Sequence, residues 1–504
     1  MSNLSDLIPA GGGQNNTDFV ADGTIASGKG VILTAAGKAA QVAESSGSET
    51  LGGPVEVNDG VTTTPYGIDM CYDSGNDRLV AVYFRSSDTY LMAAVGTISG
   101  TTTTWGTPVV VNSAAGDKEP CVDYDPDTGK VLTLYVRASD GNARYNVGTV
   151  SGTTSTWGSS GEFHGQNTRE GLNLTYDTTH DYFLCTYHSA SGDDASVKIG
   201  SISGTTVTFG SNYVFTTGAS CLIIGIAYDV NADAFAVLYR NNSSDLYGIV
   251  GTSTAAKVVT YGSETQIGTW DPSGLGGITY DSTAQKCVAI FRNSSEYGAG
   301  AVVTVVGGST RSFTDGTETA FVSANISGDD FSCHATYAGT SANTTTVMFK
   351  EDSDNYPRFC NGTVTGTSIA FNTAARLWTD NALYARGNIC PIASGKVGFI
   401  AQSSSSTGSL VDNYAYASVL QNVTTTSNMT ATNLLGIAAG AISDTATGTI
   451  NTWGSRNEVQ TSLTIGSDYY VQGDGTITTT STSPAQLIGK AISATQINIK
   501  DYTG

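Results

Sequence analysis

A stretch of 52 residues recurs along this chain, and it constrains the fold more than any other feature. A Tyr-Asp pair marks the first clear copy at Tyr72-Asp73, and it returns every 52 residues, at 124–125, 176–177, 228–229 and 280–281. Two further aromatic series keep the same period: Tyr83, Tyr135, Tyr187, Tyr239 and Phe291, and Trp105, Trp157, Phe209, Tyr261 and Phe313. Three series with one period show that the chain is built from repeats, so the repeat has to be interpreted before any single motif.

Each copy has the pattern of four β-strands. In the first copy, strand one ends at the Tyr-Asp pair, and a turn rich in Asp, Asn and Gly leads to a second strand at Leu79–Phe84. Such residues favour tight hairpin turns. The third strand carries Val-Gly-Thr-Ile-Ser-Gly at 95–100, and the fourth contains Trp105-Gly106. We interpret these repeated residues as scaffold, with the Tyr ring buried and the Asp capping an Asx turn.

The last copy is incomplete, and this predicts how the fold closes. We count seven copies, and the seventh stops one strand short, at Val423. The segment 53–58, which precedes the first copy, resembles the last strand of that copy at 107–112. We therefore predict an all-β fold, a seven-bladed β-propeller of four-stranded repeats, with strand 53–58 completing the last blade. An open solenoid is the alternative, but it would not need a strand borrowed from the far end.

The repeat pattern does not extend to the chain ends. From Asn433 onward it is lost, and Tyr469–Ile477 has the pattern of a hairpin with an Asp-Gly turn. Residues 1–47 add one more hairpin pattern. Because ring closure brings residues near 50 and 425 together, we predict that 1–47 and 426–504 form one small antiparallel β domain, into which the propeller at 48–425 is inserted.

Charge and hydropathy exclude several classes of function. With 23 Lys and Arg against 44 Asp and Glu, the net charge is −21, which disfavours binding to nucleic acid or to anionic membranes. No apolar run reaches the roughly 18 residues of a membrane-spanning helix, so no membrane insertion is expected. The segment Met1–Gly13 lacks a basic start and an apolar core, so we expect no secretory signal.

No motif predicts a metal site, a cofactor or a catalytic group. The four histidines (His164, His180, His188 and His334) show no metal-ligand spacing, and Asp125–Gly129 resembles the start of a calcium loop without the Glu at its twelfth position. Asp69 and Asp123 are expected to project toward a central cavity together with Asn173 and His334. Two carboxylates could serve a glycosidase, but polar groups there more often join neighbouring blades.

Residues that break the repeat are the better candidates for function. The segments between blades and the turns between second and third strands carry aromatic residues that we expect to be exposed and to bind glycans: Tyr90, Tyr145, Trp270, Tyr297, Tyr356 and Trp378. Aromatic faces beside Asn and Asp suit sugars, whose apolar ring faces stack and whose hydroxyls form hydrogen bonds.

The repeat Val-Gly-Thr-Ile-Ser-Gly-Thr-Thr-x-Thr-Trp/Phe-Gly-x-Pro-Val resembles propeller repeats in virion proteins of tailed phages, notably marine ones. Phe19–Gly28, 469–477 and Leu487–Ser493 are similar to modules of phage tail-fibre and appendage proteins. The resemblance implies a non-enzymatic structural protein on the virion surface, made in the host bacterial cytoplasm. Its partners would be other tail or capsid proteins and host-surface polysaccharide, and it would be a homo-oligomer. A capsid decoration protein or head fibre is the alternative within this class, and a glycan-cleaving propeller enzyme the alternative outside it.

Overall fold

The fold is all-β, as predicted. The computed structural model describes residues 15–46, 48–60, 62–169, 171–218, 221–241, 245–267, 276–326, 333–339, 343–353, 356–378, 383–403, 410–423, 425–430, 432–481 and 485–500. These residues form 47 strands and no helix, so the described chain holds no helix that could cross a membrane. They divide into two compact units: 48–423, and 1–47 together with 424–504. We call the first the propeller and the second the terminal unit.

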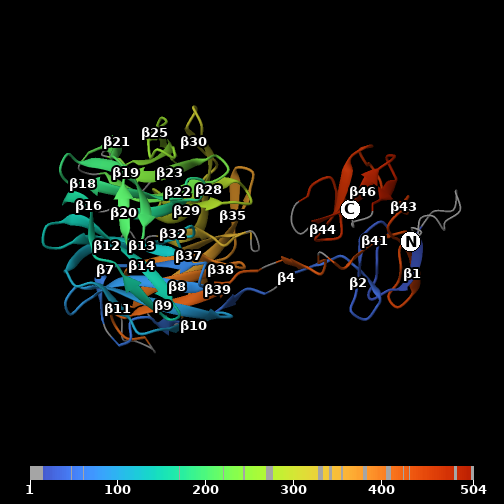
Figure 1. Cartoon of the computed structure of the whole chain (residues 1–504), viewed down its shortest axis with the longest axis horizontal. Coiled ribbons are helices and arrows are strands. Elements are labelled where there is room, and N and C mark those ends of the chain that lie inside the picture. The colour runs from blue at the N-terminus through green and yellow to red at the C-terminus, as the bar shows by residue number, and fades with distance from the viewer. Residues whose placement is uncertain are drawn as a thin grey trace. The chain divides into compact units, whose positions relative to one another are not determined.

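The propeller consists of seven antiparallel sheets in the described residues, which we number as blades 1 to 7 along the chain (Figure 1). Blade 1 holds β7 (Thr63–Asp73), β8 (Arg78–Arg85), β9 (Leu91–Ser99), β10 (Thr102–Trp105) and β11 (Val109–Asn112). Blade 2 holds β12 (Gly116–Asp125), β13 (Lys130–Arg137), β14 (Asn142–Ser151), β15 (Thr154–Trp157) and β16 (Gly161–Asn167). Blade 3 holds β17 (Asn173–Asp177), β18 (Tyr182–Ser189), β19 (Asp194–Ser203), β20 (Thr206–Phe209) and β21 (Tyr213–Thr217).

Blade 4 holds β22 (Leu222–Asp229), β23 (Ala234–Arg240), β24 (Leu246–Ser253), β25 (Val259–Tyr261) and β26 (Thr265–Gln266). Blade 5 holds β27 (Gly276–Asp281), β28 (Lys286–Arg292), β29 (Tyr297–Val306), β30 (Ser312–Asp315) and β31 (Thr319–Asn325). Blade 6 holds β32 (Cys333–Tyr337), β33 (Thr345–Lys350), β34 (Pro357–Thr365), β35 (Ser368–Phe371) and β36 (Ala375–Arg376). Blade 7 holds β37 (Leu383–Ile392), β38 (Lys396–Ser403) and β39 (Ala415–Gln421), with β5 (Thr50–Leu51) and β6 (Val55–Glu56) from the start of the propeller.

The first strands of the blades meet around a common axis. Each packs against the first strand of the next blade, in the order β7, β12, β17, β22, β27, β32 and β37, and β37 packs against β7. We call this last contact, between blades 7 and 1, the closing junction, and the other six the internal junctions. Between the blades lie buried aromatic rings, among them Tyr83, Tyr135, Tyr187 and Tyr239 of the second repeated series. The ring is closed by packing of apolar blade faces, which leaves only short outer edges.

The outermost strand differs from the prediction, because it is split into two pieces. In blade 1, β10 and β11 both pair with β9, and the Trp105-Gly106 step lies between them. A methyl group on Gly106 would lie 2.0 Å from the carbonyl oxygen of Thr153, in the hairpin between the third and fourth strands of blade 2. Only glycine lets that backbone approach so closely. The outermost strand is therefore interrupted at the repeated glycine, where the backbone of the neighbouring blade packs against it.

The aromatic residue of the Trp-Gly pair has its own glycine partner. Trp105 lies opposite Gly96 in the β9–β10 ladder, and Trp157 lies opposite Gly148 in the β14–β15 ladder. A methyl group on Gly96 would come within 3.0 Å of the Trp105 ring. The Val-Gly-Thr motif thus leaves room for the ring on the blade face, an aromatic–glycine pairing that fixes strand register.

The Tyr-Asp corner is confirmed as an Asx turn. Asp73 Oδ1 accepts hydrogen bonds from the backbone N–H groups of Gly75 and Asn76, both at 3.0 Å. The same pair of bonds forms at Asp125, Asp177, Asp229 and Asp281. Asp125–Gly129 is accordingly a hairpin turn. The hydroxyl of Tyr228 reaches the turn of the preceding blade and bonds with Thr179 Oγ1 at 2.6 Å, whereas that of Tyr72 bonds with Asp77 of its own blade.

The N-terminal strands complete blade 7. Thr50 and Leu51 lie opposite Gln421 and Leu420 of β39, and Val55 and Glu56 extend the same edge. Pairing begins three residues before the predicted segment 53–58. Gly52 lies between the two pieces, and a methyl group there would lie 1.9 Å from the Thr101 carbonyl oxygen of blade 1. Gly52 thus has the role at the closing junction that Gly106 has between blades 1 and 2.

In its described residues, the terminal unit contains two five-stranded sheets and one two-stranded ladder. The first sheet has the order β1-β42-β41-β2-β3, the second β43-β47-β46-β44-β45, and β4 pairs with β40. Their bounds are β1 (Asn16–Val20), β2 (Gly30–Leu33), β3 (Ala39–Gln41), β4 (Glu44–Ser46), β40 (Thr425–Ser427), β41 (Leu434–Ala438), β42 (Thr447–Asn451), β43 (Arg456–Asn457), β44 (Asp468–Gln472), β45 (Ile477–Thr478), β46 (Ala485–Ala491) and β47 (Ile497–Ile499). The sheets bury Val42, Ile437 and Val471 in one core, so residues from both chain ends build this unit.

Candidate functional site

The residues that differ between repeats lie together at one end of the propeller. Turns between second and third strands lie beside the connections between blades there: Gly116 N–H bonds to the Thr89 carbonyl, and Ile326 N–H to the Glu296 carbonyl, both at 2.9 Å. We call this end the connection face. Because strands in a blade are antiparallel, the Tyr-Asp turns lie at the opposite end. The connection face is the candidate binding surface, since its loops differ most between blades.

Three of the six predicted aromatics are partly exposed at this face. Tyr90, Tyr297 and Tyr356 each follow a turn between the second and third strand of their blade, and each is intermediate in burial. The Arg85 guanidinium lies 5.5 Å from the centre of the Tyr90 ring, and that of Arg376 lies 3.9 Å from the centre of the Tyr356 ring. Cation–π contacts therefore hold the Tyr90 and Tyr356 rings in place.

Two of the predicted aromatics are not exposed. Tyr145 is 8% exposed, and its hydroxyl accepts a hydrogen bond from Val207 N–H of blade 3 at 3.2 Å. Trp378 is 3% exposed, and its Nε1 donates to Ser418 Oγ at 2.5 Å. Both rings are packed between blades, so the prediction of exposure is wrong for them and they cannot stack on a sugar. Trp270 lies outside the described residues.

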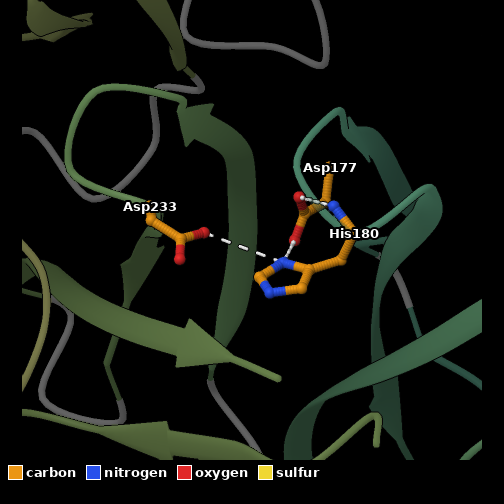
Figure 2. A group of neighbouring side chains, drawn as sticks. All are labelled: Asp177, His180 and Asp233. Carbon is orange, nitrogen blue, oxygen red and sulfur yellow. Dashed lines mark hydrogen bonds and ion pairs between the residues drawn. The ribbon is translucent and has the colours of Figure 1, made fainter. Parts of the chain in front are cut away.

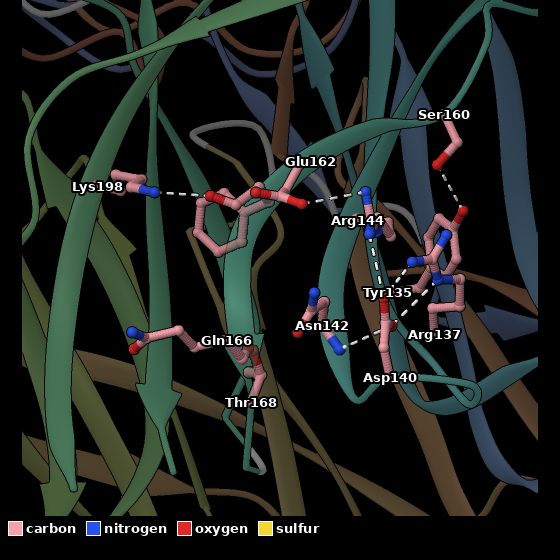
Figure 3. A network of polar contacts seen from close by, with 11 residues as sticks. Tyr135, Arg137, Asp140, Asn142, Arg144, Ser160, Glu162, Gln166, Thr168 and Lys198 are labelled. Carbon is pink, nitrogen blue, oxygen red and sulfur yellow. Dashed lines mark hydrogen bonds and ion pairs between the residues drawn. The ribbon is translucent and has the colours of Figure 1, made fainter. Parts of the chain in front are cut away.

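A polar network surrounds the turn of blade 2 at the same face (Figure 3). Arg137 donates to both carboxylate oxygens of Asp140, and Arg144 reaches Asp140 at 3.2 Å and Glu162 at 3.4 Å. Tyr135 and Ser160 share a hydrogen bond of 2.9 Å at its edge. The network presents fixed donors and acceptors, a suitable arrangement for hydroxyl groups.

Sequence reasoning missed this network, although a signal was present. Arg85-Ser-Ser-Asp88 recurs 52 residues later as Arg137-Ala-Ser-Asp140, and blade 1 makes the same Arg–Asp pair. The pair fixes both turns. Arg144 and Glu162 carry no repeat signal, because they come together only when β14 pairs with β16.

A central cavity of about 480 Å³ lies on the propeller axis. As predicted, Asp69, Asp123, Asn173 and His334 line it, and Asn388 joins them. The described residues around it include no Lys or Arg. Among the described residues, the cavity therefore holds two carboxylates without the permanent positive charge of a Lys or Arg.

The two carboxylates differ in their partners. Asp69 accepts hydrogen bonds from Met70 N–H at 2.6 Å, from Val122 N–H of blade 2 at 2.7 Å, and from the Asn388 amide of blade 7. Asp123 accepts one, from Tyr124 N–H at 2.8 Å. Burial raises the pKa of Asp69 to about 7 although its hydrogen bonds lower it. Burial likewise raises the pKa of Asp123 to about 7. Asp69 thus joins three blades.

The absence of a carboxylate at metal-ligand spacing, inferred for all four histidines, is wrong for His180. Its Nδ1 lies 3.0 Å from Asp177 Oδ2 and 3.7 Å from Asp233 Oδ1 of the next blade (Figure 2). The Asx turn folds Asp177 back onto the residue three positions later, and so places its carboxylate beside the imidazole.

Comparisons with known proteins show the fold alone. No protein-family model and no curated protein sequence matches the chain. Among solved structures, the BP39L lectin from Burkholderia pseudomallei aligns over 72% of this chain and 98% of its own, at 10% identity and a TM-score of 0.55. The Aleuria aurantia lectin, solved with alpha-methyl-L-fucoside, aligns over 63% of this chain and 98% of its own, at 12% identity and a TM-score of 0.40. The described chain therefore shares its fold with the BP39L lectin.

Proposed function

We propose that this chain is a non-enzymatic structural protein of a tailed-phage virion, a tail fibre or similar appendage, whose connection face binds host-surface glycans. The observation that carries the glycan-binding part is the gathering of Tyr90, Tyr297 and Tyr356 at the face that also holds the Arg–carboxylate pairs. Flat aromatic rings beside fixed hydrogen-bonding groups match a ligand with apolar ring faces and many hydroxyls. The structural likeness to a lectin is in keeping with this proposal.

The virion role rests on the resemblance of the repeats and of the terminal segments to phage appendage proteins. The terminal unit would attach to the particle, and the propeller would face the host. Antibody labelling of particles in the electron microscope tests this: label at the tail supports an appendage, label on the capsid supports a decoration protein or head fibre, and unlabelled particles would refute both.

Binding can be tested with the purified full-length chain and host polysaccharide on a biosensor surface. We expect saturable binding that Tyr90→Ala and Tyr356→Ala together weaken at least tenfold, since each removes a stacking ring. Trp453→Ala is the matched control, because Trp453 is an exposed aromatic of the terminal unit. Equal loss in the control, or none in the double variant, would overturn the assignment.

A glycan-cleaving enzyme is the second candidate, and the central cavity favours it. A carboxyl group with a pKa near 7 can act as a general acid, and Asp69 and Asp123 both meet that condition. Against it, both oxygens of Asp69 accept hydrogen bonds that join blades, Oδ2 from Val122 and Oδ1 from Asn388. Release of reducing ends from the same polysaccharide, lost in both Asp69→Asn and Asp123→Asn, would decide for the enzyme.

A further inference from the structure

At the junction between blades 3 and 4, several neighbouring residues differ from the residues at equivalent positions in other blades. In the Asx turns, the residue that bonds Asp Oδ2 is Asn76 in blade 1 and Thr128 in blade 2, at 2.8 and 2.7 Å. In blade 3 this residue is His180. An imidazole nitrogen, unlike an amide N–H or a hydroxyl, is a strong ligand for transition metals.

The residues around His180 are also specific to this junction. Tyr182 stacks on the imidazole, with 5.5 Å between ring centres and 10° between planes. Strand register aligns Tyr182 with Arg78, Lys130 and Lys286 of other blades. Blade 3 thus lacks the basic residue that would repel a cation, and has a ring that orients the histidine.

The next blade contributes the remaining groups. Asp233 comes from the turn of blade 4, and Tyr228 donates a hydrogen bond to its Oδ1 at 2.8 Å. Ser253 of blade 4 donates to Asp177 Oδ2 at 3.2 Å. Register aligns Ser253 with Ile98, Val150 and Ile202, so an apolar position has become a hydrogen-bond donor to the carboxylate. Partners of this kind orient metal ligands.

We propose that Asp177, His180 and Asp233 bind a divalent transition-metal cation of the Zn²⁺ type and link blade 3 to blade 4. One ligand atom from each residue lies within 4.8 Å of the others. Zinc bonds to nitrogen and oxygen of about 2.0–2.2 Å place neighbouring ligand atoms about 3.3 Å apart, and the observed separations of 3.0 and 3.7 Å from His180 Nδ1 lie on either side of that value. The Asp177 side chain is fully buried while that of Asp233 is 52% exposed, so a cation can approach from the Asp233 side.

The repeat supplies the controls for a test. His180→Asn reproduces the turn of blade 1, where Asn76 bonds Asp73, and it removes the imidazole without removing the turn's hydrogen bond. Asp233→Asn keeps an acceptor for Tyr228 and removes one charged ligand. Asp181→Asn changes the same turn position as Asp233, but in blade 3, outside the proposed site.

The experiment is titration of the tag-free, chelator-treated full-length chain with ZnCl₂ in a calorimeter, with thermal unfolding in parallel. We expect one saturable site and a rise in Tm for the native chain and for Asp181→Asn. His180→Asn and Asp233→Asn should fold with the metal-free Tm of the native chain but bind Zn²⁺ at least tenfold more weakly. CaCl₂ should not compete, since calcium prefers sites made only of oxygen ligands. No saturable binding by the native chain, or unchanged affinity in His180→Asn, would overturn the proposal.

Discussion

The closing junction and the internal junctions share a backbone contact between neighbouring blades but differ in their side-chain hydrogen bonds. Both place a glycine of one blade against a carbonyl oxygen of the next, Gly52 against Thr101 and Gly106 against Thr153. They differ in polar contacts. Between blades 3 and 4, Tyr228 bonds with Thr179 of the preceding turn, whereas Tyr72 in blade 1 bonds with Asp77 of its own blade. At the closing junction Asn388 bonds with Asp69. The backbone contact is thus common to both, and side-chain bonds vary around it.

Removing the strands that complete blade 7 should have the largest effect. A chain lacking residues 1–60 loses β5 and β6 and exposes the edge of β39. Unpaired strand edges aggregate, so we expect soluble aggregates by light scattering and no single cooperative unfolding transition. A truncated chain as monodisperse and stable as the parent would contradict closure by these strands.

Replacing the glycines that contact the next blade with alanine should destabilise closely packed junctions more than loosely packed ones. Gly52→Ala and Gly106→Ala put a methyl group about 2 Å from a backbone oxygen, and such overpacking costs about 1–3 kcal/mol of unfolding free energy. In Gly210→Ala the nearest atom to the new methyl group is Lys257 Cβ, at 3.4 Å, so stability should change by less than about 0.5 kcal/mol. Urea unfolding of the three variants measures the difference. Equal effects at all three would show that the close approach is not what requires glycine.

Stability of the propeller should fall as the pH rises from 6 to 8. Burial raises the folded-state pKa of Asp69 and Asp123 to about 7, above the ordinary value of 3.8. The folded state therefore binds these protons more tightly, and this stabilisation is lost as the pH rises through 7. Each group should contribute about 1 kcal/mol over this range.

Urea unfolding at pH 6 and 8 measures this slope, and Asp123→Asn should reduce it by about half. A slope unchanged in that variant would exclude Asp123 as a source. Between pH 4 and 6 His164 should offset part of this slope, because burial lowers its pKa to about 4 and so disfavours its protonation in the folded state.

Removal of tyrosine hydroxyls should cause the smallest loss of unfolding free energy. Tyr228→Phe removes the bond to the preceding blade and that to Asp233, and should cost about 1 kcal/mol. Tyr72→Phe removes one exposed bond within its own blade, and should cost less than about 0.5 kcal/mol. Chemical unfolding compares them. A larger loss for Tyr72→Phe would reverse the ranking of the two junctions.

The scaffold could be predicted from the sequence because its residues repeat. Tyr-Asp, Val-Gly-Thr and Trp-Gly predicted strands, turns and blades, and the likeness of 53–58 to 107–112 pointed to the strand that completes blade 7. Burial of Tyr145 and Trp378 could not be predicted, because each is covered by a different blade, through contacts with Val207 and Ser418. The approach of Asp233 to His180 joins residues 53 positions apart through the packing of two turns, and no local pattern records it.

Thr50 and Gln421 lie opposite each other in one ladder, so the segment of about 370 residues between them begins and ends within the spacing of paired strands, about 5 Å. A two-residue turn could bridge that gap. The propeller is therefore an exchangeable cassette: one contiguous stretch of gene encodes it, and a different module inserted between these two positions should leave the fold of the terminal unit unchanged.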